Sequence, residues 1–350
     1  FRDFLKYVQQ NDLMVTAGVM DPKGDRSKRP GDQADPDLYL RVVEEQNDGI
    51  IVNGCKAHQM GGSNAHELLA MPCRNMGPNE EEYAVAFVIP VNTKGVYQIV
   101  GRQSCDTRKL EEGDIDKGNA FYGCVETTII FDNVFVPWER VFLYKERDMP
   151  VRAMEIFGGT HRVSSGGGCV PGVMDIWIGA AATIAEYNGL SNKKHIQNKI
   201  AEMIAISESI RGCAMAACYE GYKAPSGGYF NDFTLGNVTK YLSSQSLFDL
   251  IKLLNYPAGG LPLTQPSEAD LRSPEVGKFV EKYFKAVADV PTEHRLRMMR
   301  LIENCSIGFN NHLGELHGAG SPQTQLDILY HTSNLDQKKK LAKKLAGIKE

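Results

Sequence analysis

The spacing of apolar residues changes once along this chain of 350 residues. Between Leu38 and Leu143, short apolar runs rich in β-branched and aromatic residues alternate with turns, which predicts strands. Examples of such runs are Gly49–Val52, Tyr83–Val91, Val96–Val100 and Thr127–Val136. From Val173 onward, apolar residues recur every three or four positions, which predicts helices. A chain with this change of period is expected to fold as a β domain followed by a helical bundle, in the α+β class.

The helical stripes are expected to form the core of the bundle. They comprise Val173, Ile176, Trp177, Ala180, Ala181 and Ile184; Ile196, Ile200, Met203, Ile204 and Ile210; Val276, Phe279, Val280, Tyr283, Phe284 and Val287; and Leu296, Met299 and Ile302. Further helices are expected at 237–254 and near the start, ending at Asn11. We therefore expect three segments: residues 1–36 as the end of an N-terminal helical segment with a loop, 37–150 as the β domain, and 151–350 as the bundle.

Charge and composition exclude several classes of function. The net charge is −4, and the one basic block, Lys338–Lys344, is typical of a solvated last helix, so we expect no nucleic-acid partner. No apolar run approaches the ~20 residues that cross a bilayer, so we expect no membrane span. Eight scattered cysteines indicate reduced thiols in the cytoplasm. Because Phe1 already reads as part of a helix, we expect an N-terminal part to precede it.

The stretch THRVSSGGGCVPG, Thr160–Gly172, holds a histidine and a cysteine on either side of small residues. Glycines at 166–168 can adopt backbone angles closed to other residues, so we expect a loop that folds back and brings His161 and Cys169 together. An imidazole and a thiolate at one point favour a transition metal or an iron–sulfur cluster. The alternative is a flexible linker with a surface histidine and a small buried cysteine.

Two other kinds of loop are candidates for ligand contact. The stretch MVTAGVMDPKGDRSKRPGDQADPD is dense in charge of both signs and rich in Pro and Gly, so it is either a phosphate-binding loop or an ordinary solvated loop. The turn YPAGGL and the stretch 306–323 interrupt the helices, and glycine there lets a ligand approach the backbone. Glu315 and His317 flank the second break, and by themselves they would be a surface pair.

Several long motifs, in this order, resemble one flavoprotein family. They are DPKGDRSKRPGDQADPD, KAHQMGGSNAHE, ETTIIFDNVFVPWERVF, THRVSSGGGCVPG and HGAGSPQ. Together they are similar to the 4-hydroxybutyryl-CoA dehydratase group, which is related to the 4-hydroxyphenylacetate 3-monooxygenases. The resemblance extends from Phe1 to the end of the chain. It implies an acyl-CoA dehydrogenase-like fold whose N-terminal helical domain is largely absent here, FAD and a [4Fe-4S] cluster as cofactors, an acyl-CoA thioester as substrate and a homotetramer.

The resemblance also implies roles for particular residues. FAD would contact the loop Val19, Met20, Asp21, Pro22, Lys23, Gly24, Asp25 and Arg26, the segment His58, Gln59 and Met60, and the glycine pair Gly259 and Gly260. His161 and Cys169 would be two cluster ligands, with two cysteines expected before Phe1 as the others. His161, Glu126 and Glu315 would act in catalysis.

The implied reaction is radical dehydration of 4-hydroxybutyryl-CoA to crotonyl-CoA, with isomerisation of vinylacetyl-CoA as a second activity. The alternatives are an aromatic hydroxylase that uses FADH2, and a degenerate flavin-binding member without activity. Three positions depart from the family pattern. Ser165 replaces a tyrosine, Val170 a lysine and Met60 a threonine, and one additional residue separates His161 from Cys169.

Overall fold

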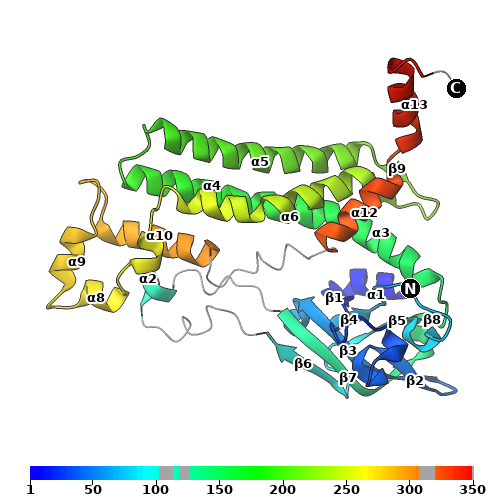
Figure 1. Ribbon diagram of the computed structural model, residues 1–350. Helices are drawn as coiled ribbons and strands as arrows, with labels where there is room; N and C mark the ends of the chain where they lie inside the picture. Colours follow the sequence, from blue (N-terminus) through cyan, green and yellow to red (C-terminus); the bar gives the residue numbers. More distant parts are fainter. Residues whose placement is uncertain (102–112, 118–125, 307–319, 349–350) are drawn as a thin grey trace. The chain divides into compact units, whose positions relative to one another are not determined.

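The computed structural model describes residues 1–101, 113–117, 126–306 and 320–348, and these residues are drawn as ribbon in Figure 1. They form two compact units, the first within Phe1–Ser104 and Tyr122–Phe157 and the second within Cys105–Phe121 and Gly158–Glu350. Each unit has its own hydrophobic core, so each can be described by itself.

The first unit is built on two four-stranded sheets, with strand orders β1-β4-β5-β8 and β2-β3-β7-β6. Helix α1 (Arg2–Asn11) precedes the strands. The strands are β1 (Val15–Gly18), β2 (Arg41–Glu45), β3 (Gly49–Met60), β4 (Glu67–Ala70), β5 (Val85–Pro90), β6 (Val96–Val100), β7 (Glu126–Pro137) and β8 (Val141–Tyr144). Pairing is antiparallel except for β1 and β4, which run parallel.

The two sheets share one apolar core. Phe87 of β5 and Phe131 of β7 contact each other edge to face, with ring centroids 5.7 Å apart. Ile50 of β3 and Leu68 of β4 are fully buried in the same cluster. Because successive side chains of a strand point to opposite faces, alternate residues of β7 enter this core.

Each of the four runs named above lies in or contains a strand, whereas a strand was not expected at β1. The runs Val96–Val100 and Thr127–Val136 coincide with β6 and β7. Strand β1 lies inside the stretch that we expected to be a loop, because Thr16 and Gly18 turn inward and Val15–Gly18 hydrogen-bonds to β4. The Pro, Gly and Asp content of this stretch predicted a loop, because the partner of the strand comes about 50 residues later and gives no local signal.

The second unit is helical. Its elements are α2 (Asp114–Lys117), α4 (Val170–Tyr187), α5 (Lys194–Tyr219), the hairpin β9 (Tyr222–Lys223) and β10 (Tyr229–Phe230), α6 (Phe233–Asn255), α7 (Leu261–Thr264), α8 (Glu268–Arg272), α9 (Gly277–Tyr283), α10 (Thr292–Ser306), α12 (Pro322–Thr332) and α13 (Leu335–Leu345). Helix α3 (Met149–Ser164) leads into it through a π-helical turn, Ser165–Cys169. In Figure 1, α4, α5 and α6 lie side by side as three long helices.

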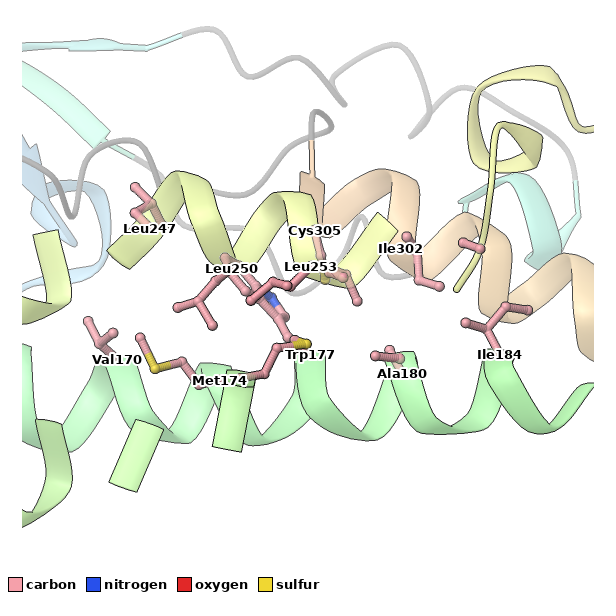
Figure 2. Packing of buried hydrophobic residues seen from close by; sticks show 14 of the residues in the cluster. Val170, Met174, Trp177, Ala180, Ile184, Leu247, Leu250, Leu253, Ile302 and Cys305 are labelled. Atoms are coloured by element: carbon pink, nitrogen blue, oxygen red, sulfur yellow. The ribbon is translucent and has the colours of Figure 1, made fainter. Parts of the chain in front are cut away.

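The core of the second unit comes from α4, α5, α6 and α10. Figure 2 shows Trp177 of α4, 1% exposed, beside Leu250 and Leu253 of α6 and Cys305 of α10. Burial of the Cys305 thiol raises its pKa to about 11. Fully burying one leucine contributes about 1.5–3 kcal/mol, so this core is a main stabilising contribution to the bundle.

The helical stripes are confirmed as core except at their edges. Ile176 and Ile204 are 55% and 45% exposed, and Phe279 and Tyr283 of α9 are 50% and 68% exposed. Ile176 lies one residue, about 100° of rotation, before the buried Trp177, which places it at the margin of the packed face. The spacing of the apolar residues predicted each stripe but not how many of its residues are buried.

One continuous helical stretch, Met149–Tyr187, is apolar and long enough to cross a membrane on those two criteria, among the residues that the structure describes. The expectation from uninterrupted apolar runs missed it. A core helix of a bundle passes the same test, and the apolar residues Met174, Trp177 and Ile184 of this stretch are buried in the core. One such segment is weak evidence for a membrane span.

Candidate functional site

The loop predicted to contact FAD is fixed to strand β3 at its inner end. The backbone N–H of Ala57 donates to the carbonyl of Met20 at 2.8 Å. The ammonium of Lys56 lies 2.6 Å from Oδ1 of Asp21 and also donates to the carbonyl of Val19. Both charged side chains are almost fully buried. The inner part of the loop is therefore structural, and the ion pair holds its path.

Asp21 has two further partners, Cys73 and Arg74. The Cys73 thiol donates to Oδ2 of Asp21 at 3.0 Å, and Nε of Arg74 lies 3.3 Å from the same oxygen. Burial by itself would raise the pKa of Asp21, but the Lys56 ammonium and these donors outweigh it and leave that pKa below its ordinary value of 3.8. Burial raises the pKa of the Cys73 thiol, which stays protonated. Asp21 is consequently a buried carboxylate.

The outer part of the same loop is open to solvent. Lys23, Gly24, Asp25 and Arg26 are all exposed. Gly24 has φ +52°, a left-handed conformation that favours glycine, and the side chain of Gln33 holds the backbone N–H and carbonyl of Asp25. The loop thus presents backbone and charged side chains outward from a fixed base, as a ligand-binding loop requires.

The second predicted segment, His58–Met60, lies at the end of β3 and not in a loop between strands. A bulge between Lys56 and Gln59 interrupts the pairing with β7, and His58 within it has φ +56°. Positive φ is uncommon for histidine, and bulges of this kind re-aim side chains near functional sites. The bulge leaves His58 exposed, while Gln59 turns inward and donates to the hydroxyl of Thr16 at 2.8 Å.

The predicted catalytic Glu126 lies beside this segment. Strand pairing places Glu126, the first residue of β7, directly opposite Met60 of β3. Glu126 is half-buried, whereas Met60 is 47% exposed. The structure therefore brings Glu126, Met60 and His58 to one end of the β3–β7 pair, close in the fold to the base of the loop.

His161 and Cys169 do not lie on a loop. His161 belongs to α3, and Cys169 ends the π-helical turn that continues without a break into α4. The expectation of a bend at the glycines is therefore wrong. Both side chains are exposed, on a common helical axis and about two turns apart, which is roughly 11 Å along that axis.

Packing explains why two of the three glycines stand in this helical stretch. A methyl group on Gly167 would lie 2.1 Å from Cβ of Ala214 in α5, and one on Gly166 would lie 3.0 Å from Cα of Lys240 in α6. A methyl group on Gly168 would meet nothing within 4 Å. Gly166 and Gly167 are thus needed for close contact between helices, which fixes them in a helical conformation despite their freedom.

The remaining predicted positions have varied surroundings. Gly259, with φ +69°, and Gly260 form an exposed turn before α7, and a methyl group on either would meet nothing within 4 Å. Ser165 and Val170, where the family pattern has tyrosine and lysine, are both buried, and Val170 belongs to the apolar core. Glu315 and its neighbour His317 lie outside the described residues.

Sequence reasoning missed a line of buried polar residues on α6. Asn237, Thr239, Lys240, Ser243 and Ser244 are all at most 4% exposed. The amide of Asn237 donates to the carbonyl of Gln325 in α12 at 2.5 Å. The signal in the sequence for this buried polar line was the run GNVTKYLSSQS. It stands in the middle of a long helix that packs against other helices on both sides.

Metal-binding groups are sparse in the part of the chain that the structure describes. There, no three or more His, Cys, Asp or Glu side chains gather closely enough to hold a metal ion. The cysteines described are free thiols, namely Cys55, Cys73, Cys169, Cys213, Cys218 and Cys305. His161 and Cys169 accordingly form at most part of a ligand set within these residues.

Two family models match the chain almost end to end. Residues 1–143 match the model described as 4-hydroxyphenylacetate 3-hydroxylase N terminal, and residues 151–347 match the corresponding C-terminal model. The chain belongs to the 4-hydroxyphenylacetate 3-hydroxylase family. The resemblance predicted from the motifs is confirmed.

Within this family, two curated relatives differ in their sequence identity to the chain. It is 44% identical to the 4-hydroxybutyryl-CoA dehydratase/vinylacetyl-CoA-Δ-isomerase of Clostridium aminobutyricum, over 100% of this chain and 74% of that protein. It is 27% identical to the oxygenase component of 4-hydroxyphenylacetate 3-monooxygenase from Thermus thermophilus, over 95% of this chain and 69% of that protein.

Comparison with solved structures gives the same family. An archaeal 4-hydroxybutyryl-CoA dehydratase from N. maritimus superposes with a TM-score of 0.96 at 43% identity, over 99% of this chain and 70% of its own. The oxygenase component of a 4-hydroxyphenylacetate 3-monooxygenase, complexed with FAD, gives 0.87 at 25% identity, over 98% and 72%. Butyryl-CoA dehydrogenase from Megasphaera elsdenii gives 0.54 at 14% identity, over 91% and 68%, a likeness of fold alone.

Proposed function

We propose that this family member dehydrates 4-hydroxybutyryl-CoA to crotonyl-CoA and isomerises vinylacetyl-CoA to the same product. The observation that carries the proposal is the 44% identity to the clostridial dehydratase/isomerase over the whole chain, against 27% to the monooxygenase component. Similarity this uneven between two branches of one family favours the chemistry of the nearer branch.

The residues assigned to FAD fit a flavin nucleotide. The loop from Val19 to Arg26 combines a buried, ion-paired base with an exposed outer part whose Lys23 and Arg26 can meet phosphate charge. At Gly259 and Gly260 the open surroundings let a ligand approach the backbone, as a bulky side chain would prevent. A related structure holds FAD. We assign these residues, with His58, Gln59 and Met60, to FAD.

The pair His161 and Cys169 fits an iron–sulfur cluster in donor type. Imidazole and thiolate are ligands that clusters use, and both side chains are exposed on one helix. Two donors do not complete a [4Fe-4S] cluster, which takes four protein ligands, so two cysteines outside this chain's described residues would be required. The spacing of about two turns suits a group with several iron atoms better than a single ion.

The proposed reaction requires side chains that transfer protons at particular carbon atoms of the substrate. The C2 proton of the substrate is acidic because the thioester stabilises the resulting enolate, whereas the C3 proton has no such help. When bound, FAD would supply one-electron transfer and the cluster a Lewis-acidic iron. Water leaves as the C4 hydroxyl and one proton, and C4 gains a proton to become methyl. We assign the proton transfers to His161 and Glu126, with Glu315 as a second carboxylate.

The departures from the family pattern limit what this site can use. With serine at 165 and valine at 170, both buried, these two positions offer the substrate neither a phenol nor an ammonium. Any substrate contact that the resemblance implies for a tyrosine or a lysine at these positions has to come from other residues here. A shift in the preferred acyl group is the expected consequence.

Turnover and spectra of the full-length protein, purified without oxygen, test the proposal. We expect flavin and iron–sulfur absorbance together, iron and sulfide in near-stoichiometric amount, and crotonyl-CoA formation from 4-hydroxybutyryl-CoA. His161→Ala should abolish both dehydration and cluster content. Glu126→Gln should lower turnover by about a hundredfold or more and leave the cluster in place. A yellow flavoprotein without iron and without dehydration would overturn the assignment.

A second function has its own support. The structure of an FAD-bound monooxygenase component superposes with a TM-score of 0.87, so the same scaffold could serve hydroxylation of a phenol by FADH2 and oxygen. That function requires neither His161 nor Cys169. Phenol hydroxylation that is unchanged in His161→Ala would establish it in place of the dehydratase. A homotetramer, a cytoplasmic location and an acyl-CoA dehydrogenase-like arrangement of the domains remain proposals from the resemblance.

A further inference from the structure

The distance in sequence between His161 and Cys169 conflicts with a shared face on a regular helix. The two residues are eight positions apart. At 3.6 residues per turn, eight positions rotate by about 800°, which is about 80° beyond two full turns, whereas seven positions rotate by about 700° and return to nearly the same face. A regular α-helix would therefore point the two side chains in different directions.

The π-helical turn between them changes this rotation. In the turn Ser165–Cys169, the backbone N–H of Val170 donates to the carbonyl of Ser165, five residues back instead of four. One such turn accommodates one more residue without rotating the helix that follows. Eight positions across this turn consequently cover the rotation that seven cover elsewhere.

Burial along the helix supports the same count independently. Arg162 and Val170 are both buried, and they are eight positions apart across the turn. Beyond it, the buried residues Val170, Trp177 and Ile184 are seven positions apart. The buried face therefore keeps its direction through the turn only because one residue is absorbed there. His161 and Cys169 each precede a residue of this face by one position, and both are exposed.

We propose that the π-helical turn keeps His161 and Cys169 in phase, so that the imidazole and the thiol lie on one exposed helix face two turns apart. With backbone positions roughly 11 Å apart along the axis, the two side chains suit a ligand with metal atoms at separate points better than a single ion with bonds of about 2.0–2.3 Å. This inference rests on the proposed function for the identity of that ligand, but the phasing itself does not.

The glycines identify the residue that the turn absorbs. Gly166 and Gly167 have no space for a side chain, whereas Gly168 has open surroundings. Deleting Gly168 should therefore give a regular helix with seven positions between histidine and cysteine, and the shared face should be kept. Inserting one alanine after Gly168 should turn Cys169 by about 100° and break the phase.

A thiol-bridging experiment tests the phasing without any cofactor. Residues five apart lie one above the other across a π-turn but about 140° apart on a regular helix. In a Ser164→Cys variant, dibromobimane should bridge positions 164 and 169, located by peptide mass mapping. The natural pair Cys213 and Cys218, five apart on regular helix α5, is the matched control and should not be bridged. Bridging of the control alone, or of neither pair, would overturn the proposal.

Iron and sulfide content tests the consequence for the ligand. In full-length protein prepared without oxygen, Gly168→Ala and the Gly168 deletion should keep the iron content of the parent within about twofold. The alanine insertion should lose most of it while helix content by circular dichroism stays unchanged. Full iron in the insertion variant, or its loss in a folded deletion variant, would refute the phasing. A parent protein without iron would instead refute the proposed function, and the bridging result would still decide the phasing.

Discussion

Two neighbouring glycines should respond in opposite ways to the same substitution. In Gly167→Ala the new methyl group would lie 2.1 Å from Cβ of Ala214, whereas carbon atoms pack best at about 3.5–4.0 Å, so α4 and α5 must separate by about 1.5 Å or more. In Gly168→Ala the methyl group meets nothing within 4 Å. Both substitutions occur in the same helical turn, so each serves as the control for the other.

The expected free energies follow from these contacts. Replacing glycine by alanine in a helix stabilises it by about 0.5–1 kcal/mol, which is all that Gly168→Ala should show. Overpacking costs about 1–3 kcal/mol, and because Cβ of Ala214 cannot rotate away, Gly167→Ala should lie at the upper end and be destabilising in net. Because both variants share the gain from alanine, they should differ by the overpacking cost alone, about 2–3 kcal/mol in free energy of unfolding.

Urea unfolding measures this difference in the second unit. Trp177 is 1% exposed in the core of that unit, and replacing Trp138 of the first unit by phenylalanine makes Trp177 the sole tryptophan. With a slope of about 2 kcal/mol per M, the midpoints should differ by about 1–1.5 M. Equal midpoints would refute the reasoning, because they would mean that Gly167 does not contact α5 as the structure has it.

Further predictions concern the loop base and the glycine turn. Lys56→Met leaves the buried Asp21 carboxylate without its main partner and should lower the free energy of unfolding by about 3–5 kcal/mol. Adding Asp21→Asn should recover part of that loss. Thermal unfolding of the single and double variants measures the coupling between the two residues. Because the folded pKa of Asp21 is lowered, its stabilising contribution is present above pH 3.8 and should be lost as pH falls further, so Asp21→Asn should flatten stability against pH in acid unfolding. Gly259→Ala should cost about 1–2 kcal/mol because φ is +69°, and Gly260→Ala should cost nothing, yet both should weaken FAD binding measured by flavin fluorescence if the backbone meets the flavin.

The sequence predicted much of the candidate site by residue type but little of its local conformation. Motifs located the loop from Val19 to Arg26 and the segment around His58, and the structure joins these two through Lys56 and Asp21. Nothing local indicates that Asp21 points inward, because its partners Lys56 and Cys73 are far along the chain. The division at 36 and 150 and the role of each site residue stay predictions.

What the sequence determined by itself was the period of its apolar residues, and with it the strands of the first unit and the long helices of the second. Period is a local property, since it depends on which neighbouring side chains share a face. Tertiary structure alone decided the conformation of Gly166–Gly168. Glycine accepts many backbone angles, so the choice fell to contacts with Ala214 and Lys240, and these contacts made a helix with a π-turn where the residues themselves favoured a bend.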